Sequence, residues 1–197
     1  MTQQYNLYHT LHGEHAELKD VNSLTNGSLC AAGLIGDVAL DAQIRLTNAT
    51  RIFALSVEAA GFGFEPYDPA WKDLFGDPHE TAAIDALQCL FADTPQQERR
   101  SYQAPISWRT LVRVLGVGFR CVQYVEEAAG IALRSVTDNP VYMLPDDTHP
   151  SGHTLQSGGF HNCLAYHAMN WLNAAWVDFT VIAIRQVDQF HDPAVTG

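Results

Sequence analysis

Three long stretches of this chain repeat apolar or small residues at steps of three and four positions, which is the spacing of one face of an α-helix. They cover about residues 25–60, 107–133 and 160–189. The last stretch is apolar nearly all round, with Leu164, Trp171, Leu172, Trp176, Phe179, Ile182, Ile184 and Val187. A helix of this kind must be covered on every side. The pattern therefore predicts a mainly helical protein whose last helix is buried by several neighbours.

The length of these helices limits how one chain can cover them. Thirty helical residues extend for roughly 45 Å, whereas a compact domain of this size is only about 40 Å across. We therefore expect the helices to span the whole body and other chains to complete their burial. Hydrophobic residues make up 47% and charged residues 17% of the chain, an apolar balance that favours extra buried surface. The prediction is a homo- or hetero-oligomer.

Segments rich in Pro and Gly separate the helices. Residues 62–79 contain three prolines and are predicted to form a loop, which a short helix follows from about residue 80 to Phe91. Residues 141–158 are β-compatible, and residues 1–20 are polar and rich in histidine. The predicted organisation is an all-α fold with a polar arm over residues 1–20 and a single helical domain over residues 21–197.

Charge and composition exclude several classes of function. The net charge of −11 argues against nucleic acids and anionic membrane surfaces, because both require a basic face. Polar residues recur within the long helices, so no membrane span is expected. The first residues lack the basic and apolar regions of a signal peptide, so a cytoplasmic location is expected. The four cysteines form no CxxC pair and are interpreted as buried free thiols: Cys30, Cys89, Cys121 and Cys163.

Two turns rich in Gly, Asn and Pro lie between the last two long helices, and a third precedes the first long helix. Together with three further motifs, they resemble, in the same order, motifs of the histidine and phenylalanine ammonia-lyases, which belong to the aromatic amino-acid ammonia-lyase family. The matching segments are Leu24–Ser28, Ala54–Ala59, Phe64–Pro69, Gln103–Arg109, Ser135–Pro140 and Ser157–His161. The resemblance extends over about residues 22–193.

This resemblance implies a fold and a reaction. The fold is a long antiparallel helix bundle of the ammonia-lyase/fumarase-like type, with a short β-like region near residues 141–158. The family is implied to form tetramers whose active sites draw on three subunits. Its reaction is the non-oxidative elimination of ammonia from an aromatic amino acid.

Five residues match the family's pocket. The resemblance implies that Asn26 contacts both the electrophilic cofactor and the substrate amine, and that Gln103 is a second catalytic residue. Arg109 is implied to bind the substrate carboxylate, onto which a guanidinium can donate two parallel hydrogen bonds. Phe160 is implied to pack against the cofactor, and Ile106, which replaces a family tyrosine, to line the substrate. The alternatives are a helix N-cap for Asn26, a loop hydrogen bond for Gln103, a salt bridge for Arg109 and core packing for Phe160.

The family's electrophile is methylidene-imidazolone (MIO), which forms from an Ala-Ser-Gly tripeptide, and this sequence contains no such tripeptide. No cofactor is therefore encoded in this chain, and we expect a partner chain to supply MIO. Without that group the β-proton of the substrate is too weak an acid for a side-chain base. The chain is thus not expected to catalyse the family reaction alone. The turn before Phe160 is also shorter than in the family, because it lacks an asparagine.

Two further hypotheses stay open. One is a homo-oligomeric, diverged enzyme that uses the pocket for another addition or elimination on a small carboxylate. The other is a non-catalytic scaffold subunit. No metal site is predicted, because His12, Glu14 and His15 lack the HExxH spacing, and His149 and His153 are interpreted as solvated turn residues.

Overall fold

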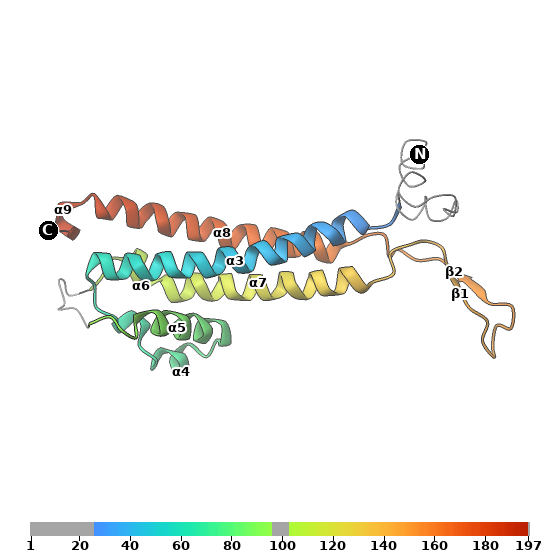
Figure 1. Cartoon of the computed structure of the whole chain (residues 1–197), viewed down its shortest axis with the longest axis horizontal. Coiled ribbons are helices and arrows are strands. Elements are labelled where there is room, and N and C mark those ends of the chain that lie inside the picture. The colour runs from blue at the N-terminus through green and yellow to red at the C-terminus, as the bar shows by residue number, and fades with distance from the viewer. Residues whose placement is uncertain (1–25, 96–102, 197) are drawn as a thin grey trace. The chain divides into compact units, whose positions relative to one another are not determined.

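The computed structural model describes residues 26–95 and 103–196, so the arm predicted over residues 1–20 lies outside the described residues. Figure 1 shows a mainly helical chain with one small β-hairpin, which confirms the predicted fold class. Its elements are α3 (Leu29–Ala60), the short 3-10 helix η2 (Glu65–Tyr67), α4 (Trp71–Phe75), α5 (Pro78–Phe91), α6 (Ile106–Arg109), α7 (Leu111–Arg134), β1 (Val141–Met143), β2 (His153–Leu155), α8 (Cys163–Phe190) and α9 (Pro193–Thr196).

The described residues group into two compact units. The first, called here the turn unit, contains residues 26–37 and 128–166. The second, called here the bundle unit, contains residues 38–95, 103–127 and 167–196. Helices α3, α7 and α8 each contribute residues to both units.

Within the bundle unit, α7 runs antiparallel to both α3 and α8 (Figure 1). Glycines on α7 permit the close approach of its neighbours: a Cβ on Gly118 would lie 2.5 Å from the Phe179 ring of α8 and 3.2 Å from the Leu46 side chain of α3. A Cβ on Gly116 would lie 2.6 Å from Cγ of Glu80, where α5 packs on α7. The buried core of this unit includes Leu46, Phe53, Val57, Tyr67, Ile84, Leu87, Trp108, Leu111, Leu115, Val125 and Phe179.

Within the turn unit, β1 and β2 pair in antiparallel register, with Val141 opposite Leu155 and Met143 opposite His153. This hairpin occupies the region predicted to be β-compatible. The helical part of the unit buries small residues and one isoleucine: Ala32, Ile35, Ala128, Ala129, Ala132 and Ala165. Small side chains allow helices to approach closely, and a Cβ on Gly36 would be only 3.6 Å from the Leu133 side chain.

Helix boundaries differ from the predicted ones in several places. The segment 62–79, predicted to be a loop, contains η2 and α4, and α5 begins at Pro78 rather than near residue 80. Proline is favourable at the first helical position because the N–H that it lacks has no partner there. The predicted helix over 107–133 is broken at Thr110, whose φ of −92° and ψ of 0° leave the helical region. The last helix begins at Cys163 instead of residue 160.

The cysteines correct one sequence-based expectation. Only Cys121 is buried, whereas the other three thiols are exposed: Cys30, Cys89 and Cys163. Each of those three cysteines lies in a predicted helix. The expectation of burial failed because no other part of the described chain covers the helix surface on which the thiol lies. None of the helices in the described residues has the length and apolarity needed to cross a membrane.

Asp77 determines where α5 begins, and this leads to a prediction. Its side chain accepts hydrogen bonds from the backbone N–H of His79 and Glu80 at 2.8 and 3.2 Å and forms an ion pair with Arg120. Replacing Asp77 with alanine is expected to lower the free energy of unfolding by about 1–2 kcal/mol, as for other helix N-caps. Asp77→Asn, which keeps an acceptor oxygen, should lose clearly less. Urea denaturation followed by circular dichroism measures both values.

The effect of Asp77 should depend on pH. Desolvation raises the pKa of Asp77, but the two backbone N–H donors and Arg120 lower it by more, so the net pKa lies below its usual 3.8. A carboxylate with a depressed pKa in the folded state stabilises the protein above its unfolded pKa, and that contribution disappears as the pH falls through the folded value. The difference between wild type and Asp77→Ala should therefore shrink below about pH 4. A difference that grows in acid would contradict this account.

Candidate functional site

Three turns meet in the turn unit, although they lie far apart in the sequence. The backbone N–H of Ser28 donates to Oγ1 of Thr137 at 3.3 Å, a contact between residues separated by 109 positions. The backbone N–H of Ser157 donates to Oδ1 of Asn139 at 2.6 Å. The turn after α7 thus binds both the turn before α3 and the turn before α8. We call these three segments, residues 26–28, 135–140 and 157–160, the turn cluster.

Two turns of the cluster are also held by local hydrogen bonds. Oδ1 of Asp138 accepts from the backbone N–H of Asn139 at 2.8 Å, and Oγ of Ser157 accepts from that of Gly159 at 3.2 Å. Gly159 permits the closest contact, because a Cβ at this position would lie 2.8 Å from the Val136 carbonyl oxygen. Short polar side chains that bind their own backbone are the usual means of fixing such turns.

The turn cluster carries two of the five predicted site residues. Asn26 is exposed, and the Phe160 side chain is 49% exposed at the end of the third turn. Core packing at Phe160 is therefore incomplete within the described residues. In the same cluster, the hydroxyl oxygen of Ser28 is shielded from solvent and has no hydrogen-bond partner among the described residues. A buried hydroxyl without a partner is unfavourable, so this part of the cluster is suited to receiving a polar group.

The other three predicted site residues lie in the bundle unit, on or before α6. The middle of α6 is anchored in the core: the Trp108 side chain is fully buried, and its carbonyl accepts a 2.7 Å hydrogen bond from the Tyr67 hydroxyl. Burial raises the pKa of the Tyr67 phenol, so it remains a donor. The Ser107 carbonyl accepts from Gln186, and the Ser107 hydroxyl donates to Gln189. Both partners lie on α8, so α6 has a fixed orientation on the bundle.

This anchoring turns the opposite face of α6 outward. Ile106 and Arg109 are three positions apart and so share one face of the helix, and the Ile106 side chain is 67% exposed. The Arg109 Nε–H donates to the Ala104 carbonyl at 2.7 Å. Its two terminal nitrogens have no hydrogen-bond or ion-pair partner among residues 26–95 and 103–196. Gln103 is exposed just before this helix. A fixed guanidinium beside an apolar side chain can bind a carboxylate that carries an apolar group.

A groove of about 740 Å³ is also present in the bundle unit, between α3, α5 and α7. Its lining residues include His79 and Gln123, whose Nε2 and Oε1 atoms are 2.8 Å apart. It contains none of the five predicted site residues and is wide open. The predicted pocket is therefore not this groove.

Sequence reasoning identified the three turns but missed the residues that join them. Thr137 and Asn139 were noted only as parts of a motif, and Ser28 only as the end of another. Their one sequence signal is composition: short hydrogen-bonding side chains at the ends of long helices, where free backbone groups need partners.

Comparison with known proteins identifies the family of this chain. The family model described as aromatic amino acid lyase matches residues 9–197. Histidine ammonia-lyase of Symbiobacterium thermophilum is 28% identical over 185 residues, which cover 91% of this chain and 35% of that protein. The histidine ammonia-lyase of Stigmatella aurantiaca is 25% identical over 187 residues, with coverages of 92% and 35%. The chain thus spans about 35% of the length of these relatives.

Solved structures share the fold. An ergothioneine-degrading ergothionase of Treponema denticola superposes with a TM-score of 0.78 at 19% identity, covering 90% of this chain and 35% of its own. A phenylalanine aminomutase of Pantoea agglomerans gives 0.78 at 22% identity, with coverages of 93% and 39%. The family match extends over nearly the whole sequence, including all three turns of the cluster and the α6 face. On this evidence, the chain belongs to the aromatic amino acid lyase family.

Proposed function

We propose that this chain contributes pocket residues for the non-oxidative elimination of ammonia from an aromatic amino acid, together with a partner chain that carries the electrophile. The observation that carries the proposal is the turn cluster. Its hydrogen bonds from Ser28 to Thr137 and from Ser157 to Asn139 join three family motifs while Asn26 and Phe160 stay exposed. Such a surface needs a further group to complete it.

The α6 face is the proposed binding site for the substrate. Arg109 would hold the substrate carboxylate with two parallel hydrogen bonds, because its Nε already donates to the Ala104 carbonyl and its two terminal nitrogens remain as donors. Ile106 would form an apolar wall for the aromatic ring. Gln103 would donate or accept a hydrogen bond at the amino group. In a family that builds its sites from several subunits, this face and the turn cluster need not come from the same copy.

The turn cluster is the proposed binding site for the MIO group of the partner chain. Asn26 can donate and accept hydrogen bonds to it, and the exposed ring of Phe160 can pack against it. The unpartnered Ser28 hydroxyl supports this fit, since a polar group at the cluster would satisfy it. When bound, MIO supplies the electrophile that activates the amino acid. The chain's own residues would position the carboxylate and the aromatic ring of the substrate, and the Asn26 amide would contact the MIO group.

Exposed apolar faces support assembly with further chains. In the bundle unit, α3 exposes a row of large apolar side chains, and α8 exposes another: Leu40, Ile44, Ile52 and Leu55, and Trp171, Val177, Val181, Ile184 and Val187. Contiguous apolar patches of this kind mark association surfaces. The expectation that one chain cannot bury these helices therefore remains part of the proposal, with a homo- or hetero-oligomer as its form.

Ile106 supports a second candidate function. An isoleucine at this position can neither donate nor accept a proton, and its side chain is exposed on the α6 face. A homo-oligomer could then use Arg109 and Ile106 for another addition or elimination on a small apolar carboxylate. A non-catalytic scaffold role would leave the same face without a ligand.

Native mass spectrometry of the protein purified from its own host tests the proposal. The expected result is a complex with a chain that contains Ala-Ser-Gly, and this complex should release ammonia and an arylacrylate from an aromatic amino acid. Asn26→Ala in this chain should abolish most of that activity without dissociating the complex. A homo-oligomer that lacks any Ala-Ser-Gly chain and is inactive on aromatic amino acids would reject the proposal and direct attention to the second candidate.

A further inference from the structure

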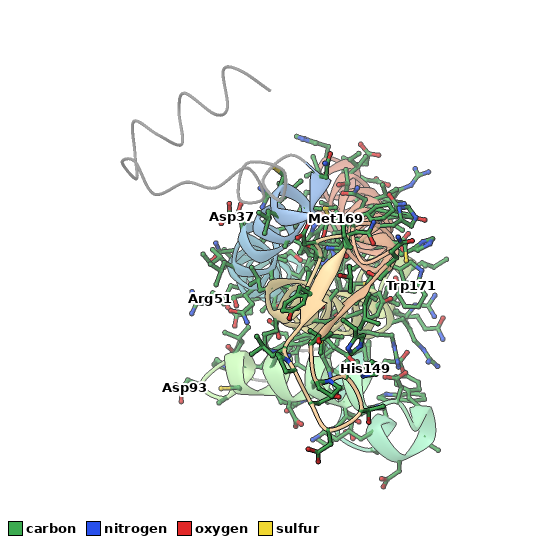
Figure 2. All side chains as sticks on the ribbon, turned by 90° about the vertical axis from the view of Figure 1, so that its right-hand side faces the viewer. Asp37, Arg51, Asp93, His149, Met169 and Trp171 are labelled. Carbon is green, nitrogen blue, oxygen red and sulfur yellow. The ribbon has the colours of Figure 1, made fainter. Side chains whose placement is uncertain are left out.

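The β1–β2 hairpin brings together three side chains that can bind metal ions. Asp146, His149 and His153 each offer one ligand atom, and these atoms all lie within 4.8 Å of one another. Nδ1 of His149 is 3.3 Å from Oδ1 of Asp146. The rings of His149 and His153 have centroids 4.0 Å apart. Figure 2 looks towards this hairpin and labels His149 on its loop.

The loop that carries these residues has a defined conformation. Oδ1 of Asp146 accepts from the backbone N–H of Thr148 at 2.9 Å and of His149 at 2.6 Å. The Gly152 N–H donates to the His149 carbonyl at 2.8 Å. Gly152 has a φ of +70°, and a Cβ there would lie 2.1 Å from the Tyr142 hydroxyl. Strand pairing fixes His153 opposite Met143. The three ligands are therefore held near each other before any ion binds.

Two further observations point to a cation. Nδ1 of His153 is shielded from solvent and has no hydrogen-bond partner among the described residues, although a buried polar atom is costly to leave unpaired. In addition, the sequence has no Lys or Arg from residue 135 to residue 184, so within this segment only histidines can offset the carboxylates of Asp146 and Asp147. A bound cation would satisfy both conditions.

We propose that Asp146, His149 and His153 form a binding site for a divalent first-row transition-metal ion, represented by Zn²⁺. Two imidazoles and one carboxylate suit such an ion better than Mg²⁺ or Ca²⁺, which prefer oxygen ligands. Tetrahedral zinc has ligand bonds of about 2.0–2.2 Å, which places neighbouring ligand atoms roughly 3.3 Å apart. The widest pair must close by about 1.5 Å or less to reach this geometry, and the exposed loop can supply that movement. Water would complete the coordination.

The site would connect the hairpin to the turn cluster. Strand β1 begins two residues after Asn139, and β2 ends two residues before Ser157. Asn139 and Ser157 share a hydrogen bond within the cluster. An ion that ties the loop end of the hairpin would therefore restrict the strands that lead to Phe160. The proposed metal site and the proposed substrate pocket use different residues and different chemistry. An experiment can therefore reject one of the two proposals without rejecting the other.

Zinc titration of the full-length chain by isothermal calorimetry, after stripping with EDTA, tests the proposal. The polar arm also contains possible zinc ligands, His12, Glu14 and His15. Variants must therefore separate zinc binding by the arm from zinc binding by the hairpin. We expect one tight equivalent of Zn²⁺ in the wild type and in His12→Gln/His15→Gln, and its loss in His149→Gln/His153→Gln. His191→Gln, an exposed histidine on the bundle unit, is the matched control and should bind as the wild type does.

Asp146→Asn provides an independent test that preserves the loop. Its amide oxygen can still accept from the backbone N–H of Thr148 and His149, but the carboxylate charge is lost. Zinc affinity should fall by at least about tenfold, as expected when a ligand or its support is altered, while the circular dichroism spectrum stays unchanged. Absence of zinc binding in the wild type would overturn the proposal, as would binding that disappears in His12→Gln/His15→Gln but persists in His149→Gln/His153→Gln.

Discussion

Replacing Trp108 with alanine is expected to lower the free energy of unfolding by about 3–5 kcal/mol, as for other fully buried aromatic side chains. The Trp108 ring meets Phe62 and Phe190 edge-on, with ring centroids 5.0 and 5.6 Å away, and its indole N–H donates to the Ser56 carbonyl at 3.3 Å. Truncation therefore removes packing from three sides and leaves a carbonyl without its donor. Because whole domains are stable by only about 5–15 kcal/mol, the loss is a large fraction of the total.

Trp71→Ala is the matched control for this experiment. The Trp71 side chain is 37% exposed, stacks on Phe75 and donates to the Glu65 carbonyl at 2.9 Å. Its loss should cost clearly less than that of Trp108, because more than a third of Trp71 is already exposed and its one hydrogen bond contributes only about 1 kcal/mol. Trp108→Phe should recover much of the stability, since a ring remains between Phe62 and Phe190. Urea denaturation with fluorescence detection measures all three; equal losses for Trp108→Ala and Trp71→Ala would contradict the packing described here.

Periodicity predicted the long helices well because burial repeats along them many times. The apolar stripe of the helix predicted over residues 107–133 includes Trp108 and Leu115, and both are fully buried. The short helices η2 and α4 were missed because so few turns carry no periodic signal. They depend on contacts across the fold, such as the hydrogen bond from the Gln88 side chain to the Tyr67 carbonyl. The break at Thr110 was missed for a different reason, because the apolar pattern continues through it.

The candidate site was predicted from the family resemblance of its motifs rather than from residue spacing or hydrophobic periodicity. Nothing in the spacing of Ser28 and Thr137 indicates that residues 109 positions apart form a hydrogen bond. The resemblance placed both turns near one pocket, and the structure supplies the hydrogen bonds between them. The residues of the proposed metal site were not predicted, because His149 and His153 look like solvated turn residues in the sequence. A hairpin register that brings His153 back beside the loop is a property of the folded chain.

Replacing Arg109 with alanine is expected to lower kcat/KM for an aromatic amino acid by roughly 30- to 1000-fold in the assembled enzyme, which corresponds to about 2–4 kcal/mol. The reason is the position of its guanidinium. Nε is held by the Ala104 carbonyl at 2.7 Å, and α6 is fixed by Trp108 and Ser107, so the terminal nitrogens are oriented before the substrate arrives. Truncation would leave the substrate carboxylate without a charged partner in the pocket.

Arg109→Lys distinguishes orientation from charge. A lysine keeps the positive charge but lacks the planar fork and cannot reproduce the Nε hydrogen bond together with a bidentate contact. It should therefore recover only a small part of the lost kcat/KM. Arg185→Ala, which removes an exposed arginine of α8, is the control and should leave kcat/KM unchanged. If Arg109→Ala behaved like Arg185→Ala, the substrate carboxylate would have to be bound by another residue, and the α6 face would lose its proposed role.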